Sequence, residues 1–441
     1  MAANMRSASP RSNGAESANV VVPLEVGRQP QMEMRASALT MPPDAVAQCR
    51  DRNWIAVLVL GVVVFVSVVI DDSSAQGPWA KMIVYVALID LGVVLASAII
   101  ALFFACFLPH LFILAVFIFG ILCGLYIASL DIFWGIVVLI VVIGFYLYSA
   151  KRIPFAVATM RISSRSLVQY PSVLALSAAG TVVVAGLYMA GAVFVNAMSP
   201  GFYFGLAAQL YLVQVVTMIA QCTTAGVAAS CFYFAESAAG RTWQALRRSS
   251  TTSLGSIACA ALTQSVVSAV NFFLITIPVI GWCVRFCLGA AFGSYRTYVL
   301  CYVAVYGSSL KDAAVSANQL LKSSGLNALV NDNLIDPVLN MVTFVASVLS
   351  IAATLDAVKP EREFRSEYDW IEDLMLAIAS AFMTVMMSGV ALQPIRTATA
   401  TLLVCWSDDP EAVKQTARPE DNAMMVDAAR GRSADLNVRF Q

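Results

Sequence analysis

Charged side chains are scarce in this chain of 441 residues. Asp, Glu, Lys and Arg make up 12% of the sequence, whereas hydrophobic residues make up 59%. About a quarter of the residues of a soluble domain are charged, so this composition excludes an ordinary soluble protein. The formal net charge is zero, which leaves no overall electrostatic basis for binding nucleic acid.

Histidine is almost absent, and cysteine is not arranged for metal binding. His110 is the single histidine, which excludes a histidine-rich metal site and leaves little basis for a catalytic triad. The ten cysteines contain no CxxC pair and mostly lie singly in apolar runs. GxSxG and Walker motifs are also missing. We therefore expect no enzymatic activity, no metal and no cofactor.

Long apolar runs dominate what is present. Each is about 20 residues long, enough to cross a hydrocarbon core about 30 Å thick, and none alternates as the strands of a membrane barrel do. The sequence predicts an all-α integral membrane protein with about ten transmembrane helices. The expected spans are 54–70, 82–107, 111–129, 132–149, 173–195, 203–234, 254–276, a region within 277–307, 334–356 and 370–392.

Lysine and arginine are unevenly divided between the segments that join these spans. With the N-terminus in the cytosol, the cytosolic segments carry 21 of them and the outer segments carry 4. The positive-inside rule therefore predicts that both termini are cytosolic. The other two, Arg285 and Arg296, are awkward inside one membrane helix, so 277–307 forms either a full span or a partly re-entrant segment.

Polar segments divide the chain into three regions. Residues 1–50 have neither periodicity nor the apolar core of a signal peptide, which predicts a disordered cytosolic tail. Residues 51–393 form the expected transmembrane transporter domain, in which 308–333 is an amphipathic cytosolic linker helix. Residues 394–441 are expected to form a cytosolic C-terminal tail.

Polar residues recur at helical spacing in two of the expected spans, on one face of each. They are Gln214, Thr217, Gln221 and Thr224 in span 203–234, and Gln264, Ser268 and Asn271 in span 254–276. Amides at this depth need partners or water, so both faces should point into the bundle. They either line a solute pathway or hold the helices together by hydrogen bonds.

Tyrosines form a third stripe, at positions 295, 298, 302 and 306. A quaternary ammonium group has no N–H to donate, and each aromatic face contributes about 0.5–2 kcal/mol to its binding. Tyr298 and Tyr302 are therefore candidate ligand contacts. The alternative is interfacial anchoring and ordinary packing, which suits Tyr295 and Tyr306 better.

Asp90 is the one acid expected deep inside a span. Intramembrane acids are functional by default, so Asp90 is a candidate counter-ion for a cationic substrate or a proton-coupling group. The alternative is a hydrogen-bonded contact between helices.

Several segments, taken in their order and spacing, resemble the choline transporter-like family. They are RIPFA at 152–156, AGVAAS at 225–230 followed by FYF, LGS at 254–256, AVYGSS at 304–309, LNALVNDNLIDPVL at 326–339 and VCWSDDPE at 404–411. The resemblance covers about residues 50–411. The ten-helix layout of that family agrees with the number of spans and the charge bias found above.

The resemblance implies transport of choline or ethanolamine, by facilitated or proton-exchange movement, to supply phospholipid synthesis. It implies a multi-pass protein of the plasma membrane, with an organelle membrane as the alternative. The partners would be a small choline-like cation and the lipid bilayer; the oligomeric state is left open.

We expect a substrate site between spans 203–234, 254–276 and 277–307, with 82–107 as a possible contributor. Its expected residues are Tyr298 and Tyr302 as aromatic contacts, Gln214 and Gln221 on the pathway, Asp90 for charge, and Gln264 and Asn271. Two alternatives are a channel or transporter for another solute, and a non-transporting membrane scaffold that binds partners through its tails.

Overall fold

The computed structural model is helical throughout the part of the chain that it describes. It describes residues 53–72, 78–130, 132–149, 153–191, 200–234, 240–275, 296–323, 335–358, 369–408 and 423. No strand occurs in these residues. The predicted all-α fold class is confirmed.

The described part of the first half of the chain forms six helices, α2 (Asn53–Asp72), α3 (Pro78–Phe107), α4 (Pro109–Leu130), α5 (Ile132–Ser149), α6 (Ile153–Gln169) and α7 (Pro171–Gly191). The described part of the second half forms α8 (Pro200–Phe234), α9 (Arg241–Ser250), α10 (Leu254–Ile275), helix 296–306, α12 (Leu310–Ser323), α14 (Ile335–Val358), α15 (Asp369–Ala391) and α16 (Gln393–Asp408). Four of them begin at proline, whose missing N–H costs nothing at the first helical position.

Five of these helices are long and apolar enough to cross a membrane. Their apolar stretches are Val84–Phe107, Pro171–Gly191, Phe204–Phe232, Ile335–Ala357 and Leu374–Ala391. They coincide with five of the expected spans, and α2, α4, α5 and α10 coincide with four more. Residues 277–295 lie outside the described residues. The total of about ten spans and the cytosolic termini stay predictions.

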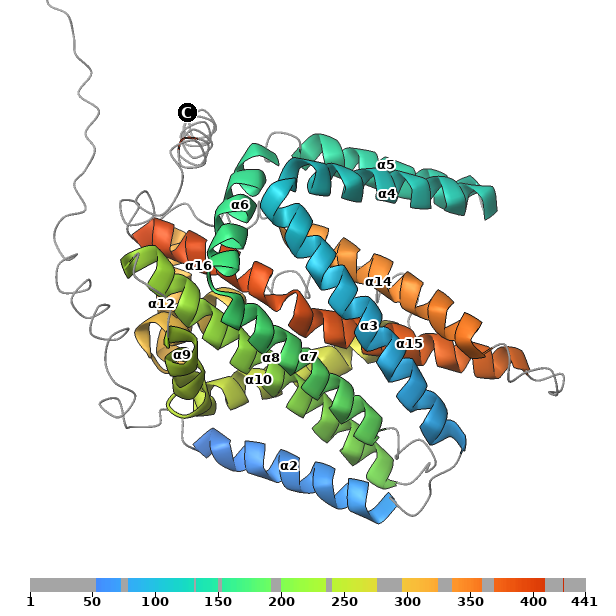
Figure 1. Ribbon diagram of the computed structural model, residues 1–441, viewed down its shortest axis with the longest axis horizontal. Helices are drawn as coiled ribbons and strands as arrows, with labels where there is room; N and C mark the ends of the chain where they lie inside the picture. The colour runs from blue at the N-terminus through green and yellow to red at the C-terminus, as the bar shows by residue number, and fades with distance from the viewer. Residues whose placement is uncertain are drawn as a thin grey trace, which may run out of the picture.

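Helix α8 is the central element of the fold. Its 35 residues make it about 50 Å long, longer than the hydrocarbon core of about 30 Å. Its apolar stretch is 83% buried, against 28% for that of α3. It packs against α2, α7, α9, α10 and α16, whereas α4 and α5 form a hairpin at the edge of the bundle (Figure 1).

Helix α16 corrects one boundary: residues 394–408 are not part of a polar tail. Thr397, Thr399 and Thr401 are 0% exposed, and the helix packs against α8 and α6. Burial is tolerated because Thr399 Oγ1 donates to Ile395 O (2.9 Å) and Thr401 Oγ1 to Thr397 O (2.8 Å). The rest of the expected tail, apart from residue 423, and residues 1–50 lie outside the described residues.

Helices α15 and α16 follow each other across a single residue, Leu392. Two backbone hydrogen bonds bridge the junction, from Leu392 N to Ser388 O (3.0 Å) and from Arg396 N to Leu392 O (3.4 Å). The two helices run nearly end to end through the bundle (Figure 1). We call the two helices together the α15–α16 rod, a nearly continuous helix that is interrupted at Leu392.

Helix α12 covers the first part of the expected linker 308–333. Ser309 Oγ donates to Asp312 Oδ2 (2.7 Å), and Asp312 N donates back to Ser309 Oγ (3.3 Å), a reciprocal pairing that caps the start of a helix. Ala313 and Ala317 are buried, in agreement with an amphipathic helix. Residues 324–333 lie outside the described part of the chain, and the cytosolic position stays a prediction.

Candidate functional sites

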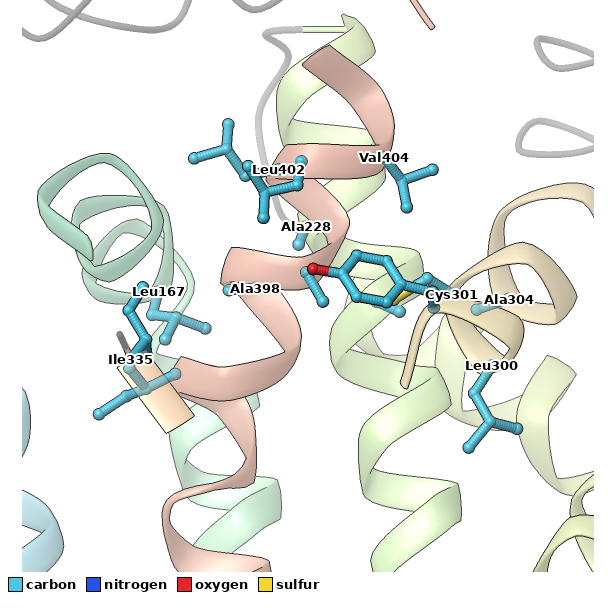
Figure 2. Packing of buried hydrophobic residues seen from close by; sticks show 14 of the residues in the cluster. Leu167, Ala228, Leu300, Cys301, Ala304, Ile335, Ala398, Leu402 and Val404 are labelled. Atoms are coloured by element: carbon cyan, nitrogen blue, oxygen red, sulfur yellow. The ribbon is translucent and has the colours of Figure 1, made fainter. Parts of the chain in front are cut away.

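Helix 296–306 lies in the main core of the protein, between α8 and α16. Cys222 Sγ of α8 donates to Leu300 O (4.0 Å), and Cys301 Sγ lies 3.3 Å from Thr401 Oγ1 of α16. Figure 2 shows Leu300, Cys301 and Ala304 on this helix and small or branched residues of α8 and α16 facing them. The tyrosine-bearing helix is therefore enclosed by protein.

The tyrosines that we expected to contact a ligand are both buried. Tyr298 is 3% exposed and Tyr302 is 7% exposed, so neither acts as an interfacial anchor. The ring of Tyr306, which is half-buried, is stacked on that of Tyr302. The hydroxyl of Tyr298 has no hydrogen-bond partner among the described residues. Tyr295 lies outside them.

The start of helix 296–306 carries a surplus of positive charge. Arg396 Nε lies 2.8 Å from Asp336 Oδ1, and Arg396 Nη2 donates to Asn340 Oδ1 (3.0 Å). Arg296 interacts electrostatically with both Arg396 and Asp336. Tyr298 also lies close enough to Asp336 to interact with it. Two guanidinium groups thus surround one carboxylate, and a bound cation is less favoured beside Tyr298 than beside Tyr302.

The far end of helix 296–306 is held by α9. Gly307 has a φ of 62°, and a Cβ at this position would lie 2.9 Å from Arg248 Nη2. Burial lowers the pKa of the Arg248 guanidinium, and the nearby Cys222 thiol acts in the opposite direction. The absence of a side chain at Gly307 therefore lets this arginine pack against the backbone directly after Tyr306.

Gln221 is the least satisfied polar side chain of α8. It is 0% exposed, and neither its amide oxygen nor its amide nitrogen has a partner among the described residues. Thr217 and Thr224, on the same face, donate instead to the carbonyls of Val213 and Ala220 (both 2.8 Å). Gln214 is half-buried. An orphaned amide costs about 1–3 kcal/mol, which marks Gln221 as a candidate ligand contact.

The polar stripe of α10 is only partly described. Gln264 is half-buried and its Nε2 donates to Ser268 Oγ (3.4 Å) on the same helix. Asn271 lies on α10, but its side chain is outside the described part. No described hydrogen bond links Gln264 to the tyrosines of helix 296–306.

Asp90 lies in a different part of the bundle. It is 0% exposed on α3 and accepts a hydrogen bond from Ser380 of α15 at 2.8 Å. Ser380 belongs to the same rod as Thr401, the contact of Cys301, and the stretch between them is about 30 Å long at 1.5 Å per residue. The structure therefore does not bring Asp90 together with Tyr298 and Tyr302.

Four hydroxyl residues around Asp90 were missed by the sequence analysis. Ser350 and Thr354 lie on α14, and Ser380 and Thr384 lie on α15. The two residues of each pair are four positions apart, so they lie on the same face of their helix. That spacing inside an apolar span was the signal that could have found them.

Five helices long and apolar enough to cross a membrane, packed into one bundle, indicate a helical integral membrane protein. Residues 198–411 match the family described as plasma-membrane choline transporter. This match agrees with the resemblance to the choline transporter-like family that the sequence segments indicated.

Curated relatives support the same assignment. The chain is 27% identical to Protein PNS1 of Eremothecium gossypii over 74% of its own length and 68% of the relative's. It is 26% identical to Protein PNS1 of Mycosarcoma maydis over 62% and 59% of the two lengths. It is 24% identical to Protein PNS1 of Debaryomyces hansenii over 76% and 75%. The chain thus spans about three fifths to three quarters of these relatives.

Proposed function

We propose that this protein transports choline or a related amine such as ethanolamine across the plasma membrane, by facilitated or proton-exchange movement. The observation that carries the proposal is the stacked pair of Tyr302 and Tyr306 on a helix enclosed by α8 and α16. This helix lies within the part of the chain that matches the transporter family. The proposal includes ten spans with both termini in the cytosol.

The chemistry of the pair suits a trimethylammonium group. Such a group cannot donate a hydrogen bond, and it gains about 0.5–2 kcal/mol from each aromatic face, more when the site is dry. Tyr302 is the first candidate contact, because Tyr298 lies nearer to the charges of Asp336 and its two arginine neighbours.

The polar candidates take supporting roles in this proposal. Gln221 offers an unpaired buried amide, which can bind the hydroxyl of choline or the amine of ethanolamine. Gln214, Gln264 and Asn271 are assigned to the pathway. Asp90 is not assigned to the amine site.

Uptake by the purified protein in lipid vesicles tests the function. With radiolabelled choline, we expect saturable uptake that excess unlabelled choline inhibits and that protein-free vesicles lack. Parallel assays with and without a pH gradient separate proton exchange from facilitated movement. Flux that does not saturate would indicate a channel, and no specific choline flux at all would refute the proposal.

A further inference from the structure

Helices α3, α14 and α15 meet around a group of oxygen atoms that we call the Asp90 cluster. It consists of Asp90, Ser350, Thr354, Ser380 and Thr384, all 0% exposed. Apolar residues of α3, α7 and α15 form a hydrophobic cluster on the same helices, among them Val86, Val94 and Met387. The Asp90 cluster is thus a group of buried polar side chains on three of the helices that are long and apolar enough to cross a membrane.

The hydrogen bonding of this cluster is incomplete. Ser380 Oγ donates to Asp90 Oδ1 (2.8 Å), and Thr354 Oγ1 donates to Ser380 Oγ (3.4 Å). The other carboxylate oxygen, Asp90 Oδ2, has no partner among the described residues, and neither have the hydroxyls of Ser350 and Thr384. Both hydroxyls face the carboxylate. Ser350 and Thr384 thus lie near enough to act on Asp90 as donors, but no hydrogen bond of good geometry joins them to it, and the oxygen lone pairs of the three groups converge.

Other hydroxyl residues on α14 behave differently. Thr343 donates to Leu339 O (3.1 Å) and Ser347 donates to Thr343 O (2.8 Å), each four residues back along the helix. Such bonds satisfy a hydroxyl inside an apolar helix. Ser350 makes no such bond within the described structure, and its hydroxyl is directed to the Asp90 carboxylate instead.

The described charges around α3 do not neutralise Asp90. On the packed helices, Tyr188 of α7 lies in the surrounding apolar cluster, Asp356 of α14 is exposed, and Asp336 is paired with Arg396. Arg165 of α6 lies near Cys106, about 24 Å along α3 from Asp90. Arg161 of α6, one helical turn before Arg165, and the exposed His110 of α4 belong to that same distant end of the bundle.

An ionised carboxylate at this depth costs several kcal/mol unless a positive charge accompanies it. We propose that the Asp90 cluster is a binding site for one small monovalent cation, a proton or Na⁺, separate from the amine site at the tyrosines. Hydroxyl and carboxylate oxygens face the cation, and these are the ligands that small hard cations prefer. The binding claim does not depend on choline being the transported solute.

Loading of this site should stabilise the packing of α3 against α14 and α15. The folded protein binds the cation and the unfolded chain does not hold the four hydroxyls in place, so ligand stabilises the fold by mass action. The stabilisation should appear as pH falls if the cation is a proton. It should appear as NaCl is added at constant pH and ionic strength if the cation is Na⁺.

The test is thermal unfolding of the purified full-length protein across pH 5–8 and across NaCl concentrations, with N-methyl-D-glucamine chloride as the balancing salt. We expect the melting temperature to rise along one of the two axes. Asp90→Asn should remove that dependence, because the amide is neutral at every pH. Asp312→Asn, an exposed carboxylate on α12, is the matched control and should keep it.

A second variant keeps the test decisive if Asp90→Asn does not fold. Thr384→Val preserves the shape of the side chain and removes one hydroxyl that faces the carboxylate. If the cation is Na⁺, the variant should weaken its apparent affinity by about tenfold, the effect of losing one hydrogen-bonding group at a charged site. If the cation is a proton, the variant should move the pH-dependent rise in melting temperature to higher pH, because the ionised carboxylate loses a hydrogen-bond donor. The proposal would be overturned if the melting temperature of the wild type depended on pH and on Na⁺ no more strongly than that of Asp90→Asn. It would also be overturned if Thr384→Val changed neither the pH dependence nor the Na⁺ dependence.

Discussion

The ring of Tyr306 is stacked on the ring of Tyr302, with their centroids 5.0 Å apart and their planes inclined by 24°. Tyr302 is buried and Tyr306 is half-buried, so the pair joins an enclosed ring to one nearer the protein surface. A cation that approaches along helix 296–306 would meet Tyr306 first and Tyr302 second.

Substitutions at Tyr302 separate the aromatic face from the hydroxyl. Tyr302→Phe keeps the face, so choline uptake should stay within about twofold of wild type. Tyr302→Ala removes a contact of about 1 kcal/mol or more, so the half-saturating choline concentration should rise about fivefold or more. The measurement is uptake into vesicles of known protein content. Equal uptake by both variants would remove Tyr302 from the site, and Tyr298→Ala should have the smaller effect.

Substitution at Gln221 separates a binding role from a structural one. Gln221→Met keeps the approximate volume and removes the orphaned amide, so the protein should be stabilised by about 1–3 kcal/mol. If the amide contacts the solute, uptake should nevertheless fall. Thermal unfolding and uptake are measured on the same preparation, with Gln244→Met, an exposed amide on α9, as the control. Higher stability with unchanged uptake would show that Gln221 is not a ligand contact.

Gly307 should not tolerate a side chain. Gly307→Ala forces a left-handed φ of 62° on a residue with a Cβ and brings that Cβ to 2.9 Å from Arg248 Nη2. We expect a loss of about 1–3 kcal/mol of stability, measured by thermal unfolding. The helical Gly389 has no atom within 4 Å of its Cβ position, so Gly389→Ala should be neutral or slightly stabilising. Equal effects would contradict this account of Gly307.

The charges at the start of α14 predict an unequal pair of effects. Asp336→Asn leaves Arg296 and Arg396 without their shared carboxylate, whereas Arg396→Gln leaves Asp336 facing Arg296. The first substitution should therefore lower the melting temperature more than the second. A double-mutant cycle should give a coupling of about 1 kcal/mol between Asp336 and Arg396. The reverse order of the single variants would show that Arg296 does not share the carboxylate.

The sequence predicted the apolar part of the fold well, because a helix of about 20 apolar residues has few alternatives in a membrane. It did not predict the burial of α16, where threonines make the segment look polar. Their hydroxyls bond to the preceding turn of the same helix, so a polar composition does not require solvent. Burial of this kind is decided by packing partners such as Ser163 of α6, whose Oγ lies 2.9 Å from Thr399 Oγ1.

The candidate site was predicted in its components but not in its grouping. Periodicity placed Gln221, Tyr298 and Tyr302 on inward faces, and their burial agrees with this. Periodicity within one helix does not tell at which depth a neighbouring helix contributes its polar residue. Asp90 was therefore grouped with the tyrosines, although it bonds to Ser380 in another part of the bundle.

The near-continuity of α15 and α16 has a mechanical consequence. Helix α15 contacts Asp90 through Ser380, and α16 contacts Cys301, the neighbour of Tyr302, through Thr401. Two charges about 30 Å apart interact by only about 0.5 kcal/mol at an effective dielectric constant of 20. Communication between the two places would therefore have to occur by movement of the helices that join them, such as a shift or rotation of α15 and α16 together.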